Sequence, residues 1–312
     1  MTFPLPFIHI FFMDGVGLGE NDLDSNPFLH ASLPHLTTLF GDGWFLRDNG
    51  RFPIITPQAA LTTVDATLGV NGRPQSATGQ ATILTGRNVP RLIGEHYGPK
   101  PNPAVADIIR QGTLFSEVIA AGGTAALLSP YPQAYFDAIQ SGRRLYSAVP
   151  LAAASAGIAL MGADELRNGR AVSPDFTGQG WRDMLGYTDM PLITLPAAGQ
   201  KIAALAQQYT FSFFEHWPSD RSGHRGTLAN AARHLEMLDT VIGALLTHWD
   251  NRGLLIITSD HGNIEAKNHR QHTTNPVPTL LAGTNTAHYI RQLHDLTDIA
   301  KIVRHALQLP AQ

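Results

Sequence analysis

One apolar run that ends in a cluster of polar residues constrains the fold of this chain more than any other stretch. Residues 254–258 are apolar up to Thr258, and Ser259, Asp260, His261 and Gly262 follow directly. A continuous apolar run of this length is typical of a strand buried on both faces, as in parallel sheets. Further strands are expected at 7–12, 210–216 and 277–282, and helical apolar spacing lies at 227–249 and 298–307. This alternation predicts an α/β protein with a mainly parallel central sheet flanked by helices.

Two turn-rich breaks divide the chain. Residues 98–103 contain three prolines and a glycine, and residues 195–199 form a second break. Such stretches end regular elements. We therefore expect a discontinuous core of residues 1–98 and 205–312, with a smaller domain, residues 99–204, inserted between its two parts.

Composition excludes several classes of function. The 22 Lys and Arg nearly balance the 25 Asp and Glu, for a net charge of −3, which argues against a partner that is a nucleic acid or an anionic membrane. The chain has no Cys, so any metal must be held by imidazole and oxygen. The apolar stretch at 3–13 has no basic residue before it and is too short to span a bilayer. We expect a soluble, cytoplasmic protein.

Two candidate sites follow predicted strands. Asp14 ends the first strand and precedes a glycine-rich turn, but a dinucleotide loop would need glycine where Glu20 stands. Asp14 alone is equally compatible with a turn cap and a ligand. Asp260 and His261 leave a buried strand together, and two adjacent ionisable groups there are costly unless they are paired or bound to a metal. We favour a functional site at this second position.

Three further candidates are weaker when each is taken alone. Asp220 and His224 are four residues apart, so on a helix both would face the same side and could bind one ion. His272 precedes a proline-stiffened segment that would hold a ligand in place. Ser76 lies in a turn of small residues before a helical segment at 81–85, where its hydroxyl is either an ordinary cap or, beside a metal ion, a nucleophile.

Together these residues form two ligand sets. The first comprises Asp14, Ser76, Asp260 and His261, and the second comprises Asp220, His224 and His272. Two neighbouring divalent ions are the usual apparatus for in-line displacement at phosphorus. Carboxylate and imidazole donors suit both Mn²⁺ and Zn²⁺.

Five segments in this order resemble the metalloenzyme branch of the alkaline phosphatase superfamily, which includes cofactor-independent phosphoglycerate mutase and phosphopentomutase. They are 14–17, 76–79, 220–224, 260–263 and 272–278. The resemblance implies an alkaline-phosphatase-like core that binds two metal ions through the two sets above. It also implies that Ser76 is transiently phosphorylated, and that residues 99–204 act as a cap or substrate domain.

The chain departs from the family pattern at two places. The mutase segment is similar to Ser-x-x-Gly-His, but Gln80 stands in place of the histidine. Thr78 is a second candidate nucleophile, because phosphopentomutases use threonine in a similar segment. The insert is also shorter than the mutase cap. Substrate phosphate or another anionic group has five candidate ligands: His96, Lys100, Arg143, Arg144 and Arg182.

We therefore expect a two-metal phosphatase or phosphomutase that acts on a small phosphoester through a phosphoserine. The alternatives are a phosphodiesterase or phosphonate hydrolase with the same metals, a mononuclear metallohydrolase that uses the second set alone, and a non-catalytic binding module.

Overall fold

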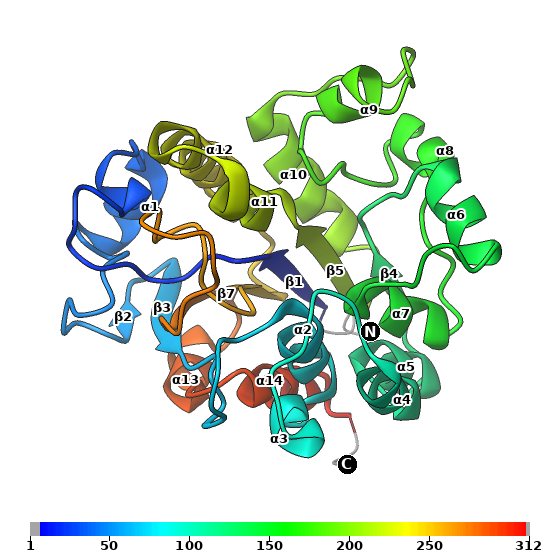
Figure 1. Cartoon of the computed structure of the whole chain (residues 1–312), viewed down its shortest axis with the longest axis horizontal. Coiled ribbons are helices and arrows are strands. Elements are labelled where there is room, and N and C mark those ends of the chain that lie inside the picture. Colours follow the sequence, from blue (N-terminus) through cyan, green and yellow to red (C-terminus); the bar gives the residue numbers. More distant parts are fainter. Residues whose placement is uncertain (1–6, 310–312) are drawn as a thin grey trace.

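The computed structural model describes residues 7–309, which form a seven-stranded sheet with helices on both faces (Figure 1). The strand order across the sheet is β2-β3-β7-β6-β1-β5-β4. The strands are β1 (Ile8–Met13), β2 (Ile54–Ile55), β3 (Ala59–Val64), β4 (Ala125–Leu127), β5 (Phe211–His216), β6 (Leu254–Thr258) and β7 (Val277–Gly283). Every residue of β1, β5 and β6 is buried, as the apolar runs of β1 and β6 predict; β5 is buried although it contains Ser212, Glu215 and His216.

The central strands are parallel and one side of the sheet is antiparallel. β4, β5, β1 and β6 run in one direction, with Phe12 paired to both Glu215 and Thr258. β7 is antiparallel to β6, β3 is antiparallel to β7, and β2 is antiparallel to β3. The prediction of a mainly parallel core is confirmed, and the antiparallel direction of β7 is an addition that affects the site.

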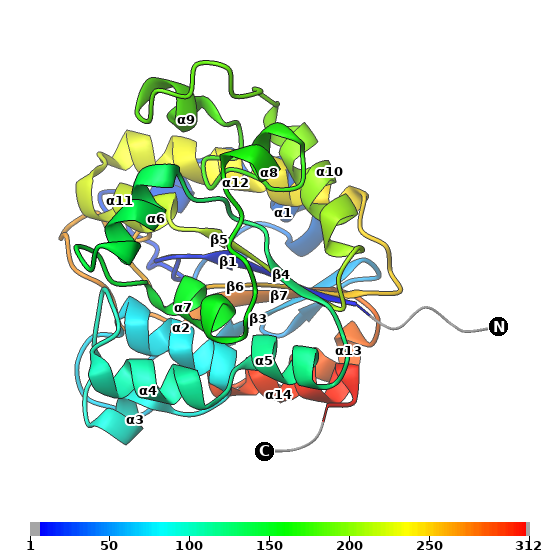
Figure 2. The same ribbon diagram turned by 90° about the vertical axis from the view of Figure 1, so that its right-hand side faces the viewer.

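Two helical layers enclose the sheet, which Figure 2 shows edge-on between them. One layer contains α2 (Ser76–Thr85), α4 (Pro103–Gln111), α5 (Leu114–Ala120), α7 (Ala148–Ser155) and α14 (Thr297–Leu307). It packs on the face that presents Ile8, Ile10 and Phe12. The other layer contains α1 (Pro34–Phe40), α10 (Leu195–Ala206) and α12 (Leu228–Thr247), and it packs on the face that presents Phe11 and Phe214.

The sequence analysis predicted three helical segments, all of which are helical in the structure, but it misplaced the start of one. The predicted helices at 227–249 and 298–307 are confirmed as α12 and α14. The side chain of Thr227 caps α12 by accepting a hydrogen bond from the backbone N–H of Asn230. The segment predicted to be helical only from residue 81 is helical from Ser76 onward, because the small residues of this turn continue into α2.

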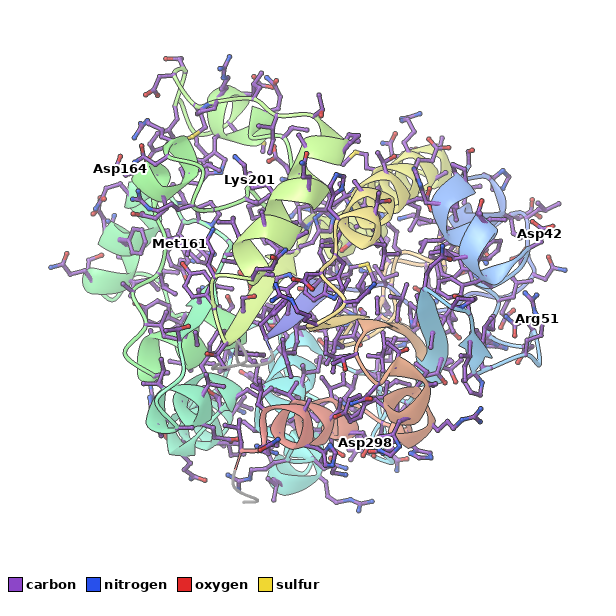
Figure 3. All side chains as sticks on the ribbon, turned by 180° about the vertical axis from the view of Figure 1, so that it is seen from behind. Asp42, Arg51, Met161, Asp164, Lys201 and Asp298 are labelled. Atoms are coloured by element: carbon purple, nitrogen blue, oxygen red, sulfur yellow. The ribbon has the colours of Figure 1, made fainter. Side chains whose placement is uncertain are left out.

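Residues 99–204 contribute to the sheet as well as to its surroundings. β4 pairs with β5 at the sheet edge, and α4, α5 and α7 share the hydrophobic cluster of the layer that contains α2 and α14. Most of α10 also belongs to this stretch and packs on the opposite face. Three further helices, α6 (Gln133–Gln140), α8 (Ala163–Arg167) and α9 (Gln179–Asp183), lie to one side of the sheet (Figure 1). Viewed from behind, Met161 and Asp164 lie on this side, and Asp42 and Arg51 lie on the opposite side (Figure 3). The division into a core and a cap stays a prediction.

The other short helices are α3 (Val89–Ile93), α11 (Pro218–Arg225) and α13 (Thr286–Tyr289), with 3-10 turns at Pro27–Leu29 and Ile290–Gln292. Within residues 7–309, no helix is both long enough and apolar enough to cross a membrane.

Candidate metal centre

The sheet topology brings the predicted ligands to one edge. Asp14 follows β1, and Asp260 and His261 follow β6, so parallel strands deliver all three to the same end of the sheet. β5 ends beside them and leads through Trp217 into α11, which carries Asp220 and His224. The segment between Asp220 and His224 is helical, so the two side chains face the same side, as the spacing predicts.

His272 and Ser76 arrive from two further elements. His272 precedes β7, and the antiparallel direction of β7 places the start of this strand at the edge where β1 and β6 end. Ser76 is the first residue of α2, whose N-terminus faces the same edge. Gly79 permits this approach, because a Cβ there would lie 2.8 Å from the Cβ of Asp260.

The first set is a buried cluster around the imidazole of His261. Nε2 of His261 lies 3.0 Å from Oγ of Ser76, 3.3 Å from Oδ1 of Asp14 and 3.6 Å from Oδ2 of Asp260. Asp260 and His261 have no exposed surface, while Asp14 keeps 8% and Ser76 keeps 6%. One donor atom from each of Asp14, Asp260 and His261 lies within 4.8 Å of the other two.

The electrostatics of the first set fit a cation. Burial, together with the charge of Asp260, raises the pKa of Asp14, and burial also raises the pKa of Asp260. Burial lowers the pKa of His261, but the charges of Asp260 and Asp14 outweigh it and raise that pKa to about 10. Oδ1 of Asp14 is buried and accepts no hydrogen bond from the described residues. A divalent ion would neutralise this concentration of negative charge.

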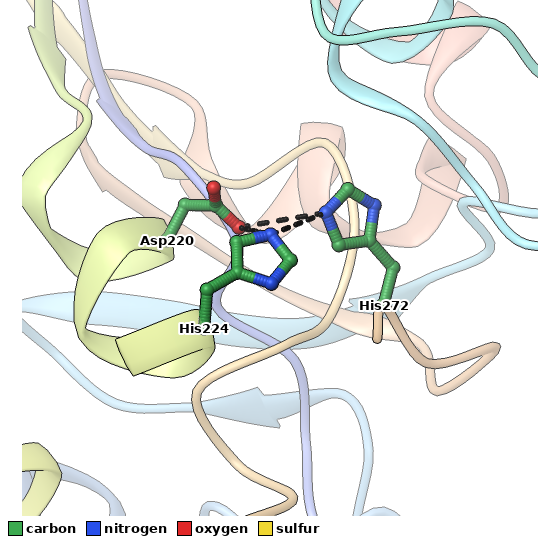
Figure 4. A group of neighbouring side chains, drawn as sticks. All are labelled: Asp220, His224 and His272. Atoms are coloured by element: carbon green, nitrogen blue, oxygen red, sulfur yellow. Dashed lines mark hydrogen bonds and ion pairs between the residues drawn. The ribbon is translucent and has the colours of Figure 1, made fainter. Parts of the chain in front are cut away.

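The second set consists of Asp220, His224 and His272 (Figure 4). Oδ1 of Asp220 lies 3.3 Å from Nε2 of His224 and 3.6 Å from Nε2 of His272, and the two Nε2 atoms are 3.2 Å apart. Each Nδ1 lies 2.8 Å from a backbone carbonyl, that of Arg270 for His224 and that of Pro74 for His272.

This hydrogen bonding sets the tautomer of both histidines. A carbonyl can only accept, so each Nδ1 is the donor and each neutral ring turns the lone pair of its Nε2 toward Asp220. Two nitrogen lone pairs that face one another at this distance cannot form a hydrogen bond. A cation placed between the two Nε2 atoms and Oδ1 of Asp220 could be bound by all three atoms. Stacking of the His261 and His272 rings, with centroids 3.7 Å apart, makes the two sets adjacent.

Three residues that the sequence analysis did not select support the ligands. Gln80, which the sequence marks only as a replacement of the histidine in the mutase segment, donates from Nε2 to Oδ2 of Asp14 at 3.3 Å and to Oδ2 of Asp260 at 3.2 Å. Asn263 donates from Nδ2 to Oδ1 of Asp220 at 2.6 Å. The buried carboxylate of Glu265 accepts four hydrogen bonds, from Gly17 N, Asn263 N, Thr273 Oγ1 and Asn275 Nδ2. No motif in the sequence marks Glu265, whose carboxylate joins the loop after β1 to the long β6–β7 connection that carries Glu265 itself.

The structure separates the two candidate nucleophiles. The hydroxyl of Ser76 points at His261. Oγ1 of Thr78 instead accepts a hydrogen bond from the backbone N–H of Tyr97, and it lies within hydrogen-bonding distance of the carbonyls of Gln75 and Tyr97. Thr78 is fully buried in these contacts.

The candidate substrate-binding residues divide into two groups. Partial burial, with a contribution from the charge of Arg144, lowers the pKa of Lys100. The guanidinium of Arg144 lies 4.9 Å from the centre of the Tyr135 ring. Backbone contacts connect this region to the nucleophile, because a Cβ at Gly98 would lie 3.2 Å from the backbone nitrogen of Ser76.

The other candidates make local contacts. Nε of Arg182 donates to the carbonyl of Met190, Nε of Arg143 donates to Oγ of Ser141, and Nε2 of His96 lies 3.3 Å from the carbonyl of Val70. Among the described contacts, none connects these three side chains to either ligand set.

A pair of tyrosines and a glutamate extends the site beyond Arg144. The hydroxyl of Tyr131 donates to Oε1 of Glu215 at 2.5 Å, and the rings of Tyr131 and Tyr135 stack with centroids 4.5 Å apart. Burial, with a contribution from the charge of Asp14, raises the pKa of Glu215 to about 7. The hydroxyl of Tyr135 is buried without a hydrogen-bond partner among the described residues.

Comparisons with known proteins agree with this geometry. The family model described as the Metalloenzyme superfamily matches residues 194–311. A 2,3-bisphosphoglycerate-independent phosphoglycerate mutase of Rhodopseudomonas palustris is 34% identical over 120 residues, which are 35% of this chain and 24% of that protein. A protein of the same name from Cyanothece sp. is 31% identical over 143 residues, covering 40% of this chain and 26% of that protein. The chain thus matches about a quarter of the length of these curated relatives.

Solved structures are similar over the whole chain. The PH0037 protein from Pyrococcus horikoshii has a TM-score of 0.56 at 15% identity, with 100% of this chain and 99% of that chain covered. The alkaline phosphatase from the Antarctic bacterium TAB5 has a TM-score of 0.54 at 10% identity, with 99% of each chain covered. At such identities the likeness establishes the fold, which is of the alkaline phosphatase type.

The fold and the clustering of the predicted ligands together define an α/β protein with two groups of candidate metal ligands at one edge of its sheet. Residues 194–311 match the Metalloenzyme superfamily, and the chain has a fold of the alkaline phosphatase type.

Proposed function

We propose that this protein transfers a phosphoryl group from a small phosphoester to Ser76 and then to an acceptor. The observation that carries the proposal is the position of the Ser76 hydroxyl, which is directed into the first ligand set at the N-terminus of α2. The helix terminus favours an anion at this point. Two divalent ions, held by the two ligand sets, would supply charge neutralisation and lower the pKa of the serine hydroxyl.

The proposed reaction has two displacements at phosphorus. In the first, a bond forms between Oγ of Ser76 and phosphorus while the bond to the leaving oxygen breaks; Ser76 loses a proton and the leaving group gains one. In the second, water or a substrate hydroxyl takes the phosphoryl group and Ser76 is restored. Exclusion of water from the site decides between a mutase and a hydrolase.

The leaving group would occupy the side of the site formed by Lys100, Arg144, Tyr135 and Glu215. Lys100 and Arg144 would bind an anionic part of the substrate, and the Tyr135 hydroxyl would find there the partner that it otherwise lacks. In this proposal, residues 99–204 provide a cap because they supply both cations and both tyrosines.

Other reactions are compatible with the same arrangement of ligand residues. A phosphodiesterase or phosphonate hydrolase would use the same ligands. A mononuclear metallohydrolase would use Asp220, His224 and His272 alone and would need neither Ser76 nor Asp14. A non-catalytic binding module is less favoured, because all seven predicted ligand residues lie at one edge of the sheet.

A substrate screen with matched serine and threonine variants tests the proposal. Phosphomonoesters, phosphodiesters and sugar phosphates are assayed with added Mn²⁺ or Zn²⁺ for wild type, Ser76→Ala and Thr78→Val. We expect turnover of a monoester that Ser76→Ala abolishes and Thr78→Val retains. Full activity of Ser76→Ala with one bound ion per chain would establish the mononuclear reaction instead. No turnover with both metal sites filled would favour the binding module.

A further inference from the structure

Gln80 occupies the one position in the α2 segment where the chain departs from the mutase pattern. It lies one turn beyond Ser76, is 5% exposed, and directs its amide between two carboxylates. Its Nε2 is 3.3 Å from Oδ2 of Asp14 and 3.2 Å from Oδ2 of Asp260. An amide nitrogen carries two hydrogens, so it can donate to both oxygens at once.

The amide restricts how each carboxylate can bind an ion. Asp14 has one oxygen held by Gln80, and the other, Oδ1, is the buried atom without a hydrogen bond. Asp260 has Oδ2 held by Gln80 and Oδ1 within 3.4 Å of the backbone N–H of Gly15. Chelation by both oxygens of either carboxylate would compete with these hydrogen bonds. The arrangement therefore favours one donor oxygen from each carboxylate.

Counting donors on this basis gives a small coordination number. One oxygen each from Asp14 and Asp260, Nε2 of His261 and Oγ of Ser76 make four donor atoms. All four residues are buried, with no more than 8% of any of them exposed. Zn²⁺ accepts four nitrogen and oxygen donors, whereas Mn²⁺ and Mg²⁺ prefer six, mostly oxygens.

We propose that Gln80 is a positioning residue that selects the ion of the first ligand set, by holding Asp14 and Asp260 to one oxygen each and so favouring Zn²⁺ over Mn²⁺. This inference rests on the proposed metal site but not on the proposed reaction. Glutamine suits the role because its amide stays neutral and keeps its two donors at all ordinary pH values. A histidine at this position could change its charge near neutral pH.

The test measures metal selectivity without turnover. Zn²⁺ and Mn²⁺ dissociation constants are determined by chelator competition for metal-stripped protein carrying His224→Ala, which weakens the second set. Gln80→Met keeps the length of the side chain and removes its donors; Gln58→Met, at an exposed position, is the matched control. The visible absorption of bound Co²⁺ reports the coordination number, since four-coordinate Co²⁺ absorbs more strongly than six-coordinate Co²⁺.

With Gln80 present we expect preference for Zn²⁺ and strong Co²⁺ absorption. Gln80→Met should shift the ratio of the two affinities toward Mn²⁺ by about tenfold, the scale of effects from residues that orient metal ligands, and weaken the Co²⁺ absorption. An unchanged ratio and spectrum in a folded variant would overturn the inference. If Gln80→Met does not fold, Gln80→Asn, whose shorter amide cannot reach both carboxylates, carries the same expectation. Loss of turnover in Ser76→Ala alone leaves this result unaffected, so the two proposals fail separately.

Discussion

Replacing Glu265 by glutamine should destabilise the protein strongly, although the change adds no bulk. The carboxylate is 1% exposed, and each of its oxygens accepts two hydrogen bonds. Oε2 binds the N–H groups of Gly17 and Asn263, at 3.0 and 2.8 Å, and Oε1 binds side chains of Thr273 and Asn275. Whichever oxygen becomes the amide nitrogen, two donors then face a donor.

The magnitude follows from the two lost hydrogen bonds. A hydrogen bond to a charged group contributes about 1.5–3 kcal/mol, so Glu265→Gln should lower the free energy of unfolding by about 3–5 kcal/mol after local relaxation. For a chain of this size, that corresponds to a fall in Tm on the order of 10 °C. Metal affinity should fall as well, because the two connections that Glu265 joins, the loop after β1 and the β6–β7 connection, carry Asp14, His261 and His272.

Denaturant and thermal unfolding of the metal-free protein provide the assay, with Glu95→Gln as the control. Glu95 is exposed, and its replacement should change the free energy of unfolding by no more than about 0.5 kcal/mol. A loss below about 1 kcal/mol for Glu265→Gln would refute the reasoning, because the carboxylate would then not hold the loops together.

Three further predictions concern packing, pH and metal removal. Gly79→Ala should weaken metal binding and lower activity, because its Cβ would lie 2.8 Å from Asp260; isothermal titration that gives the wild-type affinity would contradict this. Burial lowers the pKa of His9 from 6.5 to about 3, so its contribution to stability is complete above pH 6.5 and falls on acidification, by about 2 kcal/mol at pH 5. Denaturant titrations should show this slope reduced in His9→Gln, and an identical slope would exclude the role of His9. Removal of metal by a chelator should lower the Tm, and added Zn²⁺ or Mn²⁺ should restore it in the wild type. The Tm of Asp260→Asn should recover much less. Equal recovery in both proteins would show that the stabilising ion binds elsewhere.

The sequence predicted those features that depend on local signals. The segments that form β1, β6 and β7 are mostly apolar, so their burial was evident from the sequence. β5 also contains Ser212, Glu215 and His216, which are buried although they are polar. Asp14, Asp260 and His261 come directly after strands, Asp220 and His224 lie at helical spacing, and the sheet topology brings these five to one edge.

Features that depend on tertiary contacts could not be predicted in this way. β4 has only three residues, too few to show a period, and its pairing with β5 is what ties residues 99–204 to the sheet. The antiparallel direction of β7 explains why His272, which precedes its strand, reaches a site otherwise built after strands. Gln80 contacts Asp14 and Asp260, which are 66 and 180 positions away in the chain. Glu265 binds three donors within ten positions and a fourth, Gly17, which is 248 positions away.

Trapping phosphate on the chain tests the central claim most directly. Metal-loaded protein is mixed with a phosphoester that it turns over, quenched in acid, digested and mapped by mass spectrometry. The account predicts one phosphoryl group on the peptide that contains Ser76, located on Ser76, absent from Ser76→Ala and from metal-stripped protein, and retained in Thr78→Val. Phosphate on Thr78, or continued turnover with no phosphate on Ser76 at any quench time, would contradict it.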